Sequence, residues 1–268
     1  MRTIARVAVS VFRESVRNKV LYSLVCFAVL LISTAYLIGQ LTAGQDIKII
    51  KDLGLAAISI FGLLIAVFLG ITLVWKEIEQ RSIYSMLAKP LSRAEFVLGK
   101  YAGLALTLVV NVGLMGIAYY AMLAYMATTF PPEARAAWPA PAVDPALMKA
   151  LGLILVELLL VTAVALFFST FSSPFLSAVL TLAIWVIGTF DADLRNFESV
   201  VASPSAAALA RGLYYLIPNF GAFDVKLQVV HGLPVSWVYV VTTAAYGAVY
   251  VVLLLTGAVA IFSRRDFK

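Results

Sequence analysis

The sequence predicts an all-α integral membrane protein with six transmembrane helices, and three observations support this fold class. Of the 268 residues, 63% are hydrophobic and only 13% are charged, whereas about a quarter of residues are charged in ordinary soluble domains. The mean hydropathy is +0.99. The apolar stretches are long and do not alternate with polar residues, so helices are favoured over the short alternating strands of a membrane barrel.

Six apolar runs approach the roughly 20 residues that a helix needs to cross about 30 Å of hydrocarbon. We expect spans at residues 20–40, 53–75, 98–127, 147–170, 174–190 and 236–262. Together they predict a single transmembrane domain over 1–268, with a less apolar outer segment at 191–235 that holds a short helix near 206–217. The fifth run is the shortest of the six. The prolines of 128–145 exclude one continuous helix there.

Residues 1–19 predict an amphipathic helix that lies in the membrane interface. Ile4, Val7 and Val11 recur at helical spacing, and arginines lie between them. A cleaved secretory signal peptide is the alternative, since a basic start leads into an apolar run. Because this charged helix comes first and no convincing cleavage site follows, an uncleaved first span is favoured.

The distribution of positive charge predicts the topology. With both termini in the cytoplasm, most of the 20 Lys and Arg residues fall within 1–19, 76–100 and 264–268. Cytoplasmic loops carry such an excess of basic residues. We therefore expect a multi-pass protein of the cell (inner) membrane with both termini cytoplasmic, and we assign no nucleic-acid partner to the net charge of +6.

Residues 76–97 form a charged segment between two apolar runs, and they predict a short cytoplasmic helix. Tyr84, Met86 and Leu87 give it an apolar face, and Pro90 ends it. Ser92 then predicts the N-cap of the next helix, with Glu95 at the position that completes a capping box. The pattern alone leaves two interpretations open, a helix that docks into a partner's cleft and a solvated loop.

The run KEIEQRSIYSMLAKPLSRAEFVLGKYAG resembles the signature of type-2 ATP-binding-cassette (ABC) exporter permeases. It departs from that pattern at Arg81–Ser82, where many members carry Gly-Thr. The whole plan of the chain, from the basic N-terminal helix to the short C-terminal tail, is similar to that of the family, including a branch linked to maturation of copper enzymes. The matching positions are Glu77, Glu79, Leu87, Pro90, Ser92, Arg93, Leu98, Gly99 and Lys100.

This resemblance implies a permease subunit that dimerises with a second copy or a related permease and binds a separately encoded ATPase. ATP and Mg²⁺ would bind to that partner, and an unidentified substrate would cross between the permease subunits. Glu77, Glu79, Arg81 and Arg93 would make ionic contacts with the ATPase, and Pro90 and Gly99 would set the turn geometry. The residues implied in coupling are Glu77, Glu79, Arg81, Tyr84, Met86, Leu87, Pro90, Ser92, Arg93, Gly99 and Lys100.

The residues themselves argue against an enzyme. A chain so committed to spans leaves no room for a soluble catalytic domain. Gly99–Lys100 is the nearest approach to a phosphate-binding loop, but Tyr101 stands in place of the required Ser or Thr, and Ala94 in place of the first glycine. We expect no cofactor on this chain. An intramembrane enzyme would need paired catalytic groups at depth, and Glu157 is the one acid well inside a predicted span.

Glu157 and Asn111 are the candidates for an intramembrane polar site. A role of Glu157 in a substrate path or proton relay is one hypothesis. The favoured alternative is an acid that faces the bundle and is hydrogen-bonded to Asn111, Tyr119 or a hydroxyl.

Metal binding by the third span is the weaker of two interpretations of its methionines. Met115, Met122 and Met126 follow helical spacing with Tyr119, and thioethers bind Cu(I), but ordinary packing is favoured. His231 has no companion ligands, so we predict no metal site.

Gly99 and Gly103 would let another helix approach the base of the third span closely. One rival remains for the whole chain, a membrane anchor or regulatory subunit of an ATPase complex that does not itself transport.

Overall fold

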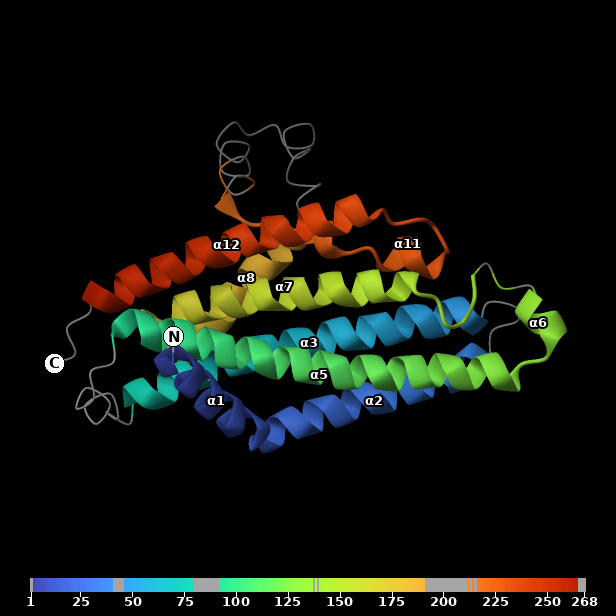
Figure 1. Ribbon diagram of the computed structural model, residues 1–268, viewed down its shortest axis with the longest axis horizontal. Helices are drawn as coiled ribbons and strands as arrows, with labels where there is room; N and C mark the ends of the chain where they lie inside the picture. The colour runs from blue at the N-terminus through green and yellow to red at the C-terminus, as the bar shows by residue number, and fades with distance from the viewer. Residues whose placement is uncertain are drawn as a thin grey trace.

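The computed structural model describes residues 2–40, 46–79, 92–136, 138, 140–190, 212, 214 and 216–264. Within these ranges the chain is helical and contains no strand. The long helices run side by side (Figure 1). In chain order the elements are α1 (Arg2–Val16), α2 (Lys19–Gln40), α3 (Asp46–Glu79), α5 (Arg93–Thr129), α6 (Pro132–Ala136), α7 (Ala146–Ser169), α8 (Pro174–Thr189), η2 (Gly221–Phe223), α11 (Lys226–Val230) and α12 (Trp237–Arg264).

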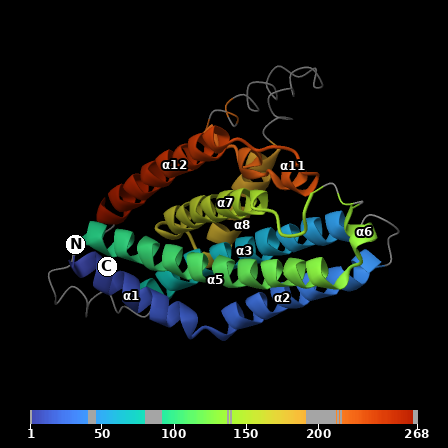
Figure 2. The ribbon, with the colours of Figure 1, turned by 45° about the vertical axis from the view of Figure 1, so that its right-hand side comes forward.

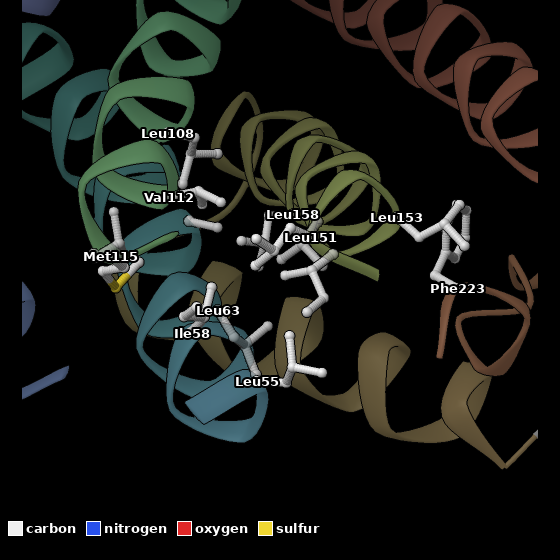
Figure 3. Packing of buried hydrophobic residues seen from close by; sticks show 14 of the residues in the cluster. Leu55, Ile58, Leu63, Leu108, Val112, Met115, Leu151, Leu153, Leu158 and Phe223 are labelled. Carbon is white, nitrogen blue, oxygen red and sulfur yellow. The ribbon is translucent and has the colours of Figure 1, made fainter. Parts of the chain in front are cut away.

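The centre of the bundle is formed by α3 and α7. In their most apolar stretches 72% and 67% of residues are buried, against 44% for α5 and 22% for α12. Both central helices are therefore enclosed by protein, whereas α5 and α12 keep broad apolar faces toward the surroundings. Figure 3 shows side chains of the shared core, which include Leu55, Ile58, Leu63, Leu108, Val112, Met115, Leu151, Leu153, Leu158 and Phe223.

Three glycines allow α3 to approach its neighbours closely. Gly54, Gly62 and Gly70 recur every eighth residue. A Cβ at Gly54 would overlap the ring of Tyr119 on α5, one at Gly62 would overlap Leu158, and one at Gly70 would lie 2.7 Å from the Cβ of Ala165 on α7. Small residues serve the same purpose between membrane helices in general.

The two ends of the bundle hold different elements. The start of α1 and the end of α12 lie at one end in Figure 1, and α6 lies at the other. At the α6 end, the Nζ of Lys51 donates to Pro141 O (2.8 Å). The Nζ of Lys149 donates to Val235 O (2.5 Å) and lies 4.9 Å from the ring centre of Trp237. These buried or half-buried cations therefore hold α3, α7 and the start of α12 to the loops at that end.

The prediction of six spans is confirmed only in part, because four to five candidate spans occur among the described residues. Four helices, α3, α5, α7 and α12, are long and apolar enough to cross a membrane, and a fifth span arises if Thr3–Val16 and Lys19–Ala35, which bend by 65°, are counted as one. The 16 residues of α8 reach about 24 Å, which is short of a bilayer core. The predicted runs 20–40 and 174–190 correspond to α2 and α8, and neither helix is counted as a span on its own.

The described part of the segment before α12 packs against the bundle. η2 contacts α7, and α11 contacts both α3 and α7. Phe220, Phe223 and Val229 are buried there, and Phe223 faces Leu153 in Figure 3. Much of the helix expected at 206–217 lies outside the described residues.

Candidate functional site at the base of α5

The first turn of α5 has the predicted capping box. Ser92 Oγ accepts a hydrogen bond from the backbone N–H of Glu95 (3.2 Å), and Ser92 N–H donates to Glu95 Oε2 (3.2 Å). Two backbone donors of the helix start are thereby satisfied within the chain. The capping box fixes where the charged segment ends and α5 begins.

Arg93 binds the end of the last helix. Its Nη1 donates to Phe262 O (3.1 Å) and to Ser263 O (2.7 Å). These carbonyls belong to the last turn of α12, which lacks its own intrahelical donors and carries partial negative charge. Next to this contact, the rings of Phe96 and Phe262 stack with centroids 5.7 Å apart. The base of α5 is therefore joined to the C-terminal end of α12, which meets it in both ribbon views (Figures 1 and 2).

Lys100 and Gly99 lie inside this assembly. Lys100 is only 1% exposed, and its Nζ lies 5.1 Å from the ring centre of Phe96. Gly99 falls within α5, so the expectation that it sets a turn geometry is wrong. A Cβ at Gly99 would lie 2.7 Å from Val7 Cβ on α1. Gly99 and Lys100, two of the positions that resemble the permease signature, thus pack against helices of this chain.

The predicted Gly99-x-x-x-Gly103 approach is confirmed, and its partner is α1. A Cβ at Gly103 would lie 2.6 Å from Val11 Cβ and 2.7 Å from Ala8 O. The apolar face predicted for residues 1–19 therefore packs along the base of α5. The same few turns of α5 hold both α1 and α12.

Other predicted coupling residues lie on or beyond the edge of the described chain. Glu77 and Glu79 occupy the last turns of α3, which end where the charged segment begins. Those outside the described residues are Arg81, Tyr84, Met86, Leu87 and Pro90.

Glu157 and Asn111 make hydrogen bonds to different partners and not to each other. Glu157, 7% exposed on α7, accepts a hydrogen bond at Oε1 from Trp185 Nε1 on α8 (2.7 Å). Asn111 Nδ2 donates to Thr107 O within its own helix (2.6 Å), and Tyr119 OH donates to Lys51 O (3.0 Å). The expectation of a buried acid facing the bundle is confirmed, but its partner is an indole that the sequence analysis did not single out.

Replacing Glu157 tests its structural role. Glu157→Ala leaves the Trp185 indole N–H without its acceptor, and we expect a loss of about 1–3 kcal/mol in stability. Glu157→Gln keeps an acceptor oxygen and should restore most of that loss in thermal unfolding of the detergent-solubilised protein. If Glu157→Gln is as unstable as Glu157→Ala, the hydrogen bond to Trp185 is not what Glu157 contributes.

A polar pocket opens between α12 and the segment that precedes α11. Its volume is about 460 Å³. Asn219 N–H donates to Tyr246 OH (2.9 Å) at this pocket. Several hydroxyl groups thus line a cavity beside a span that is otherwise apolar. The lining residues are Tyr214, Ile217, Asn219, Ala222, Thr242, Thr243, Tyr246 and Tyr250.

The methionines of α5 pack in the core. Met115 and Met126 are fully buried with Tyr119 between them, and Met122 packs against the same cluster. Within the described residues there is no group of three or more His, Cys, Asp and Glu side chains placed to hold a metal ion. The ring of His231 contacts Leu227 O (2.9 Å). The interpretation of the methionines as core residues is confirmed.

No model of a known protein family matches this chain. A search of curated proteins likewise finds no significant match.

Proposed function

We propose that this chain is the membrane-spanning permease subunit of an ABC exporter, which dimerises and couples to a separate ATPase to move a substrate. The observation that supports the proposal is how the helices on either side of residues 80–91 are connected. This segment joins α3 and α5, two helices of 34 and 37 residues, and the base of α5 binds α1 and α12. A movement of this segment would therefore displace α3, α5, α1 and α12 together.

The mechanism follows from this connectivity. ATP binding and hydrolysis in the partner would move the charged segment, with Glu77, Glu79 and Arg81 as its ionic contacts. Because Arg93 and Phe96 bind the end of α12, and Gly99 and Gly103 receive α1, a tilt of α5 would carry both helices with it. In secondary transporters, alternating access is largely a rigid-body rocking of one helix bundle against another.

Localisation to the cell (inner) membrane with both termini cytoplasmic belongs to the same proposal. The charged segment is flanked by helix ends that lie at the same end of the bundle as the start of α1 and the end of α12 (Figure 1), and the positive-inside rule places that end in the cytoplasm. We count α2 and α8 as the additional spans that complete six, with α8 tilted little and the bilayer thinned around it.

A non-transporting anchor or regulator of an ATPase complex is the second candidate. It would keep the charged segment and the joined base of α5. The polar pocket beside α12 favours the permease, because an anchor needs no hydroxyl-lined cavity at that position. Removing one hydroxyl group of this pocket distinguishes the two candidates. Tyr246→Phe should impair transport and leave ATPase binding intact.

Affinity purification of the tagged protein in mild detergent tests the proposal. We expect a soluble ATPase to co-purify and to hydrolyse ATP, and we expect Glu79→Arg to abolish its recovery. Lys48→Glu, a charge reversal near the start of α3, is the matched control and should retain the ATPase. Arg93→Glu is less selective, since it also breaks the contact with α12. Isolation of the chain without any ATPase would contradict the proposal.

A further inference from the structure

A large cavity lies beside α1 and the bend that leads into α2. It has a volume of about 1220 Å³. Four basic residues and one acidic residue line it, together with small polar groups and three apolar side chains. The lining residues are Ala5, Arg6, Val9, Ser10, Arg13, Glu14, Ser15, Arg17, Asn18, Lys19 and Leu69.

The cationic side chains gather on the face of α1 that points away from α5. Arg6, Arg13 and Arg17 are exposed, whereas Val11 on the opposite face is buried against Gly103. Lys19 adds a fourth cation from the start of α2. The lining therefore carries an excess of positive charge, with Glu14 as its one acid, and such an excess attracts an anion. Arginine in particular binds phosphate oxygens through two parallel N–H donors.

Two further observations indicate what kind of anion fits. Ser15 is 1% exposed, lines the same cavity, and its Oγ is a buried polar atom without a hydrogen-bond partner in the described structure. Buried hydroxyls are normally satisfied. Val9, which is 46% exposed, and Leu69 of α3 provide an apolar wall. Cationic groups beside an apolar wall suit a molecule with an anionic head and a hydrocarbon tail.

We propose that this cavity, beside α1 and the bend between α1 and α2, binds the phosphodiester headgroup of an anionic phospholipid from the cytoplasmic leaflet. Arg6, Arg13 and Arg17 would hold the phosphate, and the acyl chains would run along Val9 and Leu69. The site would fix α1 in the interface at the level where it packs on α5. This inference does not depend on an ATPase partner.

Retention of lipid by the purified full-length chain tests this site. We would measure bound phosphatidylglycerol by native mass spectrometry, and thermal stability with added phosphatidylglycerol, phosphatidylcholine or glycerol 1-phosphate. Phosphatidylglycerol should be retained and should raise the unfolding temperature, whereas the zwitterionic lipid and the soluble phosphate should do neither. Equal stabilisation by glycerol 1-phosphate would mean a site for a free anion and would overturn the proposal.

Two variants locate the binding. Arg13→Gln should weaken phosphatidylglycerol binding about fivefold, the factor expected for one interfacial charge, and Lys48→Gln is the matched control that should not. Ser15→Ala should also reduce retention, yet leave the lipid-free protein at least as stable as the parent, because it removes an unsatisfied buried group. Unchanged retention in both Arg13→Gln and Ser15→Ala, or an equal loss in Lys48→Gln, would overturn the proposal.

Discussion

Gly103→Ala should release α1 from the bundle. The new Cβ would lie 2.6 Å from Val11 Cβ and 2.7 Å from Ala8 O, and one of these atoms belongs to a helix backbone that cannot rotate away. Overpacking of this kind costs about 1–3 kcal/mol. We expect a fall of several degrees in the unfolding temperature, and faster tryptic cleavage after Arg13 as α1 separates from α5.

Gly113→Ala is the matched control, because it lies on the same helix and a Cβ there meets nothing within 4 Å. It should leave both the unfolding temperature and the cleavage rate near those of the parent protein. If Gly103→Ala behaves like Gly113→Ala, α1 does not pack on the base of α5 as described.

Gly188→Ala should have a second large effect, at the contact between α8 and the segment that precedes η2. Its Cβ would overlap Pro218 O and lie 2.6 Å from Phe220 Cδ2, while Gly188 O accepts a hydrogen bond from Phe220 N–H (2.9 Å). A backbone oxygen and a buried ring leave little room to adjust, so we expect a destabilisation near the upper part of the ~1–3 kcal/mol range for overpacked sites.

Thermal unfolding in detergent would again report the change, with Gly152→Ala on α7 as the control in open space. An unfolding temperature equal to that of Gly152→Ala would show that this segment is not held against α8.

Local patterns in the sequence were enough to place several of the long helices. The expected spans at 147–170 and 236–262 agree within a residue or two with α7 and α12, since long apolar runs and their polar limits define such helices. Ser92 and Glu95 predicted the start of α5 because a capping box needs only residues three apart. The spacing of Gly99 and Gly103 predicted a close contact for the same reason.

The partners of those contacts could not be predicted, because they depend on how helices distant in sequence are arranged. α1 could not be chosen over another helix as the partner of Gly103. Arg93 carries no signal that its target is the end of α12, 169 residues away. Trp185 was missed as the partner of Glu157 because the register of α8 against α7 is set by packing. The basic side of α1 was visible in the sequence, but a cavity behind it was not.

The most direct test of the proposed coupling role is site-specific photo-cross-linking in intact membranes. A photoreactive amino acid replaces Tyr84 in the charged segment in one variant and Trp138, close to α6, in the other. We predict an adduct between the Tyr84 position and an ATP-hydrolysing protein, formed in a nucleotide-dependent manner, and none from the Trp138 position. Failure of the Tyr84 position to capture an ATPase, or capture of one only from the Trp138 position, would contradict the coupling role.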